Sequence, residues 1–147
     1  MSTTIEPTVK VRSLSHLAVY VRDLDISHDF YAKVLGFAIT LDEREHSRHP
    51  RIFGTIGPVT VELMKCRSEP DGPQPPPQLG LAGMAFRVDD LEAACAALHE
   101  AGHTKLKSPK SIGRLKMLFA QDPDGSFFEL VEYLPGYDSL AEAIVEN

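Results

Sequence analysis

The amino-acid sequence contains an internal repeat with a fixed offset of 67 residues. The segment SHLAVYVRDL at residues 15–24 aligns with AGMAFRVDDL at residues 82–91, and both end in Asp-Leu after an apolar stretch. The same offset relates Glu62 to Glu129 in two later apolar stretches. Because one supersecondary unit cannot bury its own hydrophobic face, the two copies are expected to pack together. The repeat therefore predicts one domain made of two similar modules.

Each copy is predicted to begin with a strand, continue with a helix and end with further strands. Residues 14–21 are rich in apolar and β-branched side chains, which is typical of a strand. Asp23 or Asp25 can cap the following helix, and Gly36 can end it. The second copy repeats this arrangement, with its helix ending at Gly102. Further strands are expected at residues 37–41, 51–56, 59–65, 103–107, 115–121 and 126–133.

The boundaries of the modules follow from composition. Residues 67–80 hold five of the eleven prolines, which predicts a stiff linker between a module at 14–66 and a module at 81–134. Residues 137–146 alternate apolar and polar side chains, as a final amphipathic helix would. We therefore expect residues 1–147 to form a single domain.

The net charge and the lack of membrane-spanning or targeting segments limit the kinds of partner and the cellular location to be expected. The 15 Lys and Arg residues against 21 Asp and Glu residues give a net charge of −6, which argues against nucleic acid or an anionic membrane as partner. No apolar run approaches the roughly 20 residues of a membrane span. Residues 1–10 have no basic stretch followed by an apolar one, so a cytoplasmic protein is expected.

Candidate functional side chains share strand faces, because residues two apart in a strand point to the same side. His16 and Tyr20 fall on one face of the first strand. Glu62 falls on the face opposite the valines of its strand, and Glu129 shares a face with Phe127. A carboxylate flanked by apolar neighbours on its own face is not expected to be fully solvated.

A metal site would explain why such groups recur at related places. Pairing of the modules with pseudo-twofold symmetry would bring four positions to one axis inside a curved sheet: His16, Glu62, Gly83 and Glu129. Two carboxylates and an imidazole at one point repel each other unless a cation or a shared proton intervenes. A divalent ion with one nitrogen and two oxygen ligands resolves this, leaving positions for water or substrate. The sequence leaves open whether one chain or two supply the ligands, and whether these are only satisfied strand residues.

These motifs resemble the vicinal oxygen chelate superfamily, which includes glyoxalase I, methylmalonyl-CoA epimerase, extradiol dioxygenases, and fosfomycin and bleomycin resistance proteins. The resemblance is carried by HLAVYVRDLDISHDFYAKVLGF at residues 16–37, DPDGSFFEL at residues 122–130 and the repeat. It implies an α+β fold in which two βαβββ modules form an incomplete barrel around a divalent metal. It also implies that the ligand positions are those at the first and last strand of each module: His16, Glu62, Gly83 and Glu129.

Gly83 departs from the family pattern, which usually has histidine there. The departure counts against an extradiol dioxygenase or a fosfomycin transferase, unless His103 or a loop histidine replaces the missing ligand. It counts less against glyoxalase-like lyases and isomerases, because Glu62 occupies a position where they hold a ligand.

The expected function is a metal-dependent lyase or isomerase acting on a small substrate with vicinal oxygens. One divalent ion (Ni, Co, Mn, Fe or Zn) would act as a Lewis acid and stabilise an enolate, after Glu62 or Glu129 removes a proton. The alternative is a metal-free protein of the bleomycin-resistance type that binds an antibiotic, or a dioxygenase. A homodimer is expected, and the residues expected to line the substrate cavity are Tyr20, Gly83, Arg87, His103, Phe127 and Tyr133.

Overall fold

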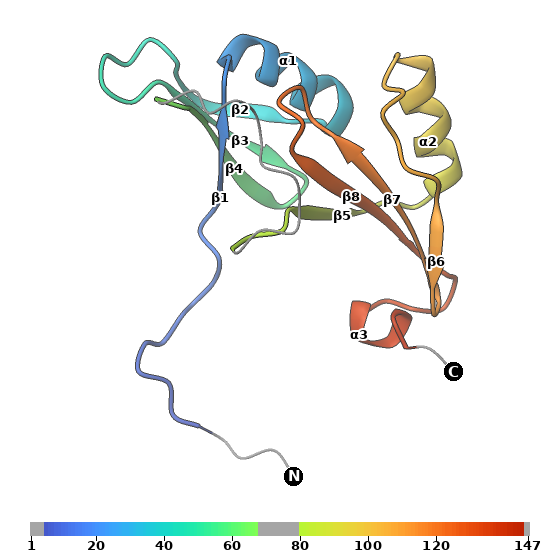
Figure 1. Ribbon diagram of the computed structural model, residues 1–147. Helices are drawn as coiled ribbons and strands as arrows, with labels where there is room; N and C mark the ends of the chain where they lie inside the picture. Colours follow the sequence, from blue (N-terminus) through green and yellow to red (C-terminus); the bar gives the residue numbers. More distant parts are fainter. Residues whose placement is uncertain (1–4, 68–79, 146–147) are drawn as a thin grey trace.

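The first module is a four-stranded mixed sheet covered by one helix. The computed structural model describes residues 5–67 and 80–145, so almost all of the expected linker lies outside the described residues (Figure 1). The strands are β1 (Leu17–Val21), β2 (Ala38–Glu43), β3 (Arg51–Ile56) and β4 (Val59–Lys65), in the order β1-β4-β3-β2. Strand β1 is parallel to β4, whereas the other neighbours are antiparallel. Helix α1 (Leu24–Leu35) packs on β3 and β4.

The second module repeats this topology. Its strands are β5 (Met84–Arg87), β6 (Lys110–Ile112), β7 (Leu115–Gln121) and β8 (Phe127–Tyr133), in the order β5-β8-β7-β6, and its helix is α2 (Leu91–Glu100). Strand β5 is parallel to β8, and the remaining pairs are antiparallel. The predicted α+β fold with two βαβββ modules is confirmed.

The helices begin where the repeat predicts. The side chain of Asp23 accepts a hydrogen bond from the backbone of Ile26, and the side chain of Asp90 accepts one from Ala93. Each bond satisfies an amide that the first helical turn leaves without a partner. Helix α1 is followed by Gly36 at φ 71°, the left-handed conformation that favours glycine.

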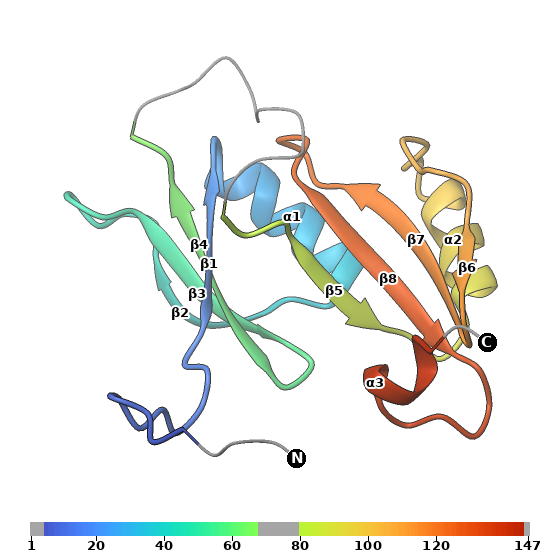
Figure 2. The same ribbon diagram turned by 60° about the horizontal axis from the view of Figure 1, so that its bottom comes forward.

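The two modules pack through their helix-covered faces and share one core. Buried Leu63 of the first sheet and Leu118 of the second belong to the same hydrophobic cluster. The ring of Phe30 on α1 lies 6.1 Å from that of Phe128 on β8. We call the opposite side of each sheet its open face. In Figure 2 the two sheets lie side by side with α1 behind them.

Two expected elements differ from those observed. Residues 103–107 form a loop rather than a strand, and the strand that pairs with β7 begins only at Lys110. Pro109 has no amide hydrogen to donate to a sheet ladder, which places the strand after it. The terminal helix α3 (Leu140–Ala143) is much shorter than the expected 137–146.

Helix α3 packs on the open face of the second sheet, where Ala143 joins Leu115, Met117 and Val131 in a small cluster. The backbone of Arg114 donates to the carbonyl of Ala143 at 2.6 Å. In the described ranges, no helix combines the length and the apolar character that crossing a membrane requires.

A buried hydrogen bond joins the modules at Asp122. The Tyr31 hydroxyl on α1 donates to this carboxylate at 2.9 Å, and the amides of Asp124 and Ser126 donate to it at 2.9 Å each. The Arg22 amide in turn donates to the Asp124 carboxylate at 3.2 Å. Polar contacts thus fix the packing of α1 against the β7–β8 turn.

We predict that Tyr31→Phe lowers the free energy of unfolding by about 1–3 kcal/mol, because a buried carboxylate loses a donor. Urea unfolding followed by circular dichroism measures the change. Tyr137→Phe is the control, since the Tyr137 hydroxyl has no hydrogen bond within the described residues. Equal stability of the two variants would contradict the assigned role of the Tyr31 hydroxyl.

The same carboxyl predicts a pH dependence. Burial, the largest influence, raises the pKa of Asp122 above its usual 3.8, although the Tyr31 hydrogen bond lowers it. Folding therefore favours the protonated acid, so this group's stabilising contribution is complete below the ordinary pKa and is lost as pH rises through the folded value. Asp122→Asn cannot ionise. The unfolding free energy of the wild type should fall relative to that of this variant between about pH 3 and pH 7. A constant difference would contradict the shift.

Candidate functional site

The open face of the first sheet carries a histidine and a buried glutamate in contact. Glu62 on β4 lies opposite Ala18 on β1 and Phe53 on β3. His16 precedes β1 and lies two residues from Ala18, which directs its ring to the same face. Its Nε2 is 3.4 Å from Oε1 of Glu62. Glu62 is only 6% exposed, so this carboxylate has little access to water.

Arg51 supplies the positive charge that a buried carboxylate needs. Its Nη1 lies 3.8 Å from Oε2 of Glu62, and its Nε donates to Glu43 at 3.0 Å. Arg51 was not among the residues that the sequence pattern predicted at the site. Its position in the predicted strand could have indicated this role. Arg51 lies two residues before Phe53, which places both side chains on one face of the strand. The arrangement leaves Oε1 of Glu62 directed at the imidazole.

Glu129 occupies the related position on the second sheet. It lies on β8 opposite Ala85 of β5 and Phe119 of β7, and it is half-buried. Burial raises the pKa of this carboxyl above its usual range. Within the described residues it has no ion pair or hydrogen bond. A carboxylate in such surroundings is suited to accept a proton from a substrate.

Gly83 precedes β5, and its backbone excludes a side chain. Its φ of 153° lies in a region that L-residues rarely adopt, and a Cβ there would approach the carbonyl oxygen of Phe127 to 2.7 Å. Because β5 lies so close to β8 here, position 83 has no room for the histidine that the family usually has. Replacing Gly83 by histidine without other changes is therefore not expected to restore a metal ligand at this position.

Arg87 and Tyr133 hold the C-terminal segment. The Arg87 guanidinium lies 4.2 Å from the ring centroid of Tyr133. It also donates to the carbonyls of Tyr137 and Asp138, at 3.3 and 3.5 Å. Arg87 was expected to line the substrate cavity, and its guanidinium instead donates to backbone carbonyls of the C-terminal segment.

The remaining expected lining residues lie in different places. Tyr20 is on the open face of the first sheet and 65% exposed. Phe127 is on the open face of the second, with the Lys107 ammonium 5.1 Å from its ring centroid. The His103 ring packs edge-on against Phe30, with the centroids 5.1 Å apart. His103 therefore lies between the modules on the helix side, away from Glu129.

The open faces are not brought together within one chain. In residues 5–67 and 80–145, no group of three or more His, Cys, Asp and Glu side chains is placed to bind a metal ion. His16 and Glu62 meet, but Glu129 does not join them. The four positions that the sequence related by symmetry therefore do not converge among the described residues of one chain, because the modules pack through their helix-covered faces. Their convergence between two chains, which the sequence left open, stays a prediction.

A basic hollow of about 610 Å³ adjoins Glu62. Arg51 lies between the two, and the other charged side chains in its wall are Lys65 and Arg67. Arg67 Nη2 contacts Nδ1 of His49 at 2.7 Å. No acidic residue lines the hollow among the described residues. In a protein with a net charge of −6, this local excess of positive charge favours an anionic group.

The repeat, the sheet order and the His16–Glu62 pair together define the class of protein. Residues 13–130 match the Glyoxalase/Bleomycin resistance protein/Dioxygenase superfamily. The chain belongs to this superfamily, and the resemblance to vicinal oxygen chelate proteins is confirmed.

Particular relatives include enzymes. The chain is 32% identical to the lactoylglutathione lyase of Escherichia coli O157:H7 over 124 residues, covering 81% of this chain and 91% of the lyase. It is 29% identical to YaeR of E. coli K12 over 126 residues, covering 83% and 97% of the two chains. A glyoxylase/bleomycin resistance protein/dioxygenase domain from Frankia sp. EAN1pec has the same fold, with a TM-score of 0.74 at 21% identity over 87% of this chain and 96% of that one.

We predict that Gly83→Ala lowers the free energy of unfolding by about 1–3 kcal/mol, because the methyl group meets the Phe127 carbonyl. The control is Gly80→Ala, since Gly80 also has a positive φ (113°) but no atom of the described residues within 4 Å of its Cβ position. Thermal unfolding of both variants separates the contact from backbone strain. Identical losses would show that the approach of Phe127 does not limit this position.

Proposed function

We propose that the protein is a divalent-metal-dependent lyase or isomerase acting on a small substrate with two adjacent oxygens. His16 and Glu62 of one chain, with Glu129 of a second copy, would hold the ion. The observation that carries the proposal is the 3.4 Å contact between His16 Nε2 and Oε1 of the buried Glu62.

The donor pair fits two ligands of one ion. Nitrogen and oxygen ligands about 2.0–2.2 Å from a tetrahedral ion lie about 3.3–3.6 Å apart, which matches the His16–Glu62 contact. An imidazole with carboxylates suits Ni, Co, Mn, Fe or Zn. When bound, such an ion acts as a Lewis acid toward the substrate oxygens. Because Arg51 contacts the other oxygen of Glu62, it would hold the carboxylate in the ligating orientation.

A homodimer would complete the site. Within the described residues of one chain, Glu129 does not join His16 and Glu62 in a cluster, and β1 and β5 each pair with one other described strand only. Exposed apolar side chains, including Leu41 and Tyr20, remain on the first sheet. A twofold dimer that places β1 of one chain beside β5 of the other would bring Glu62 near Glu129 of the second copy and cover unpaired strand edges.

The chain's own groups suit proton transfer next to a carbonyl. Glu129 would accept the proton, since burial raises its pKa and it has no partner within the described residues. The basic hollow beside Glu62 would receive an anionic end of the substrate through Lys65 and Arg67. The likeness to lactoylglutathione lyase supports lyase chemistry.

A metal-free binding protein of the bleomycin-resistance type is the second candidate. Gly83 favours it, because that position offers no ligand and cannot accommodate one. The buried Glu62 argues against it, since an apolar sequestering pocket gains nothing from a desolvated carboxylate. The dioxygenase alternative needed His103 or a loop histidine as a replacement ligand, and of these His103 packs on Phe30 instead.

We predict close to one divalent ion per chain in protein purified without chelators, measured by plasma mass spectrometry. Glu62→Ala and Glu129→Ala should each weaken Mn or Ni binding about 100-fold or more, because each removes a ligand. Glu45→Gln, on an exposed loop, is the charge-matched control. Metal retained in both ligand variants would refute the site.

Mixing the two inactive variants tests whether two chains share the site. In a shared site, a mixed dimer of Glu62→Ala and Glu129→Ala chains contains one site with all its ligands intact. Metal binding and turnover should then recover to about half of the wild-type level per mixed dimer, by the symmetry of a twofold assembly. No recovery, despite a mixed dimer shown by native mass spectrometry, would place all ligands in one chain.

A further inference from the structure

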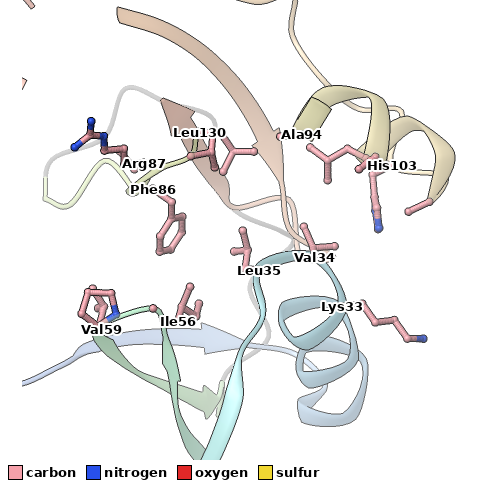
Figure 3. Close-up of a pocket in the computed structure, with 17 residues that line it drawn as sticks. Lys33, Val34, Leu35, Ile56, Val59, Phe86, Arg87, Ala94, His103 and Leu130 are labelled. Carbon is pink, nitrogen blue, oxygen red and sulfur yellow. The ribbon is translucent and has the colours of Figure 1, made fainter. Parts of the chain in front are cut away.

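A second cavity, of about 670 Å³, lies between the modules on the helix side. Its volume falls within the range of about 300–1,000 Å³ that small-molecule sites occupy. Figure 3 shows apolar side chains from both modules around it. Those that form most of the wall are Val34, Leu35, Ile56, Phe86, Ala94 and Leu130. This composition suits an apolar body rather than a polar one.

The charged groups of the cavity are all basic. Among the described residues, Lys33, Arg87 and His103 line it and no acidic side chain does. The Arg87 guanidinium stacks on Tyr133 and is therefore occupied outside the cavity. Lys33 and His103 lie at the same end in Figure 3. The Lys33 ammonium pairs with Asp29 at 2.9 Å on the exposed side of α1, so it lies at the rim of the cavity rather than inside it (Figure 3).

This cavity is separate from the candidate metal site. Leu130 faces the cavity, whereas its neighbour Glu129 shares the open face with Phe127. Consecutive residues of a strand point to opposite sides of a sheet. A ligand in the cavity would therefore lie behind the second sheet as seen from Glu129.

We propose that the cavity binds a small apolar carboxylic acid. The apolar body would pack between α1, β5 and α2. Its transfer from water to this apolar surface is favourable because of the hydrophobic effect. The carboxylate would lie at the end of the cavity marked by His103 and by the Lys33 ammonium at the rim, which it would share with Asp29. Among the described residues no acidic side chain lines the wall of this cavity, in a chain of net charge −6, which supports an anion over a cation.

Octanoate is the probe, and calorimetric titration into the full chain measures its binding. Ala97 lines the cavity, whereas its neighbour Ala96 does not, and both are exposed on α2. Ala97→Phe should fill the space and weaken octanoate binding about tenfold or more. Ala96→Phe should leave it unchanged. Equal affinities of the two variants, or no octanoate binding by the wild type, would overturn the proposal.

The polar end is tested with 1-octanol, which has the same chain without the charge. Wild type should prefer octanoate, and the double variant Lys33→Gln, His103→Gln should lose this preference while still binding octanol. Octanoate binding should also survive Glu129→Gln, which separates this cavity from the candidate metal site. Loss of binding in Glu129→Gln, or equal wild-type affinity for the two probes, would refute the assignment.

Discussion

The packing of two helix-covered faces into one core is the constraint on which the remaining structure depends. Helix α1 belongs to the first module, yet its Phe30 and Tyr31 contact the second. Burying this apolar surface stabilises the pair of modules, since neither sheet covers its own apolar side. The same packing turns the open faces outward. The glutamates of the repeat therefore lie on separate sheets without forming one cluster among the described residues, and in the proposed site a second copy would supply the missing ligand.

Glu62 is a buried carboxylate whose charge is balanced by its neighbours in the sheet. A buried charge is tolerated only with compensating partners, and here Arg51 and His16 provide them. Glu129 has no such partner within the described residues, and burial raises its pKa instead. Two residues at repeat-related positions thus have different surroundings, one paired and one without a partner among the described residues. This difference suits one to holding a cation and the other to exchanging a proton.

Much of the local structure was predictable because its causes are local. The aspartates that cap α1 and α2 act within one helical turn, and the alternation of faces follows from the strand backbone. The predicted strand at 103–107 was wrong, because Pro109 and the pairing with β7 decide where that edge begins. Arg51 and the roles of Arg87 and His103 were not recognisable, since their partners lie far away in the sequence.

The sequence by itself determined the modules, their strands and helices, and which residues share a face, because these depend on neighbours a few positions apart. Only the tertiary structure decided how the modules meet. The repeat is compatible with pairing through either face, and the choice depends on surfaces summed over many residues. That choice separates Glu62 from Glu129, places His103 beside Phe30 and creates the apolar cavity between α1 and α2.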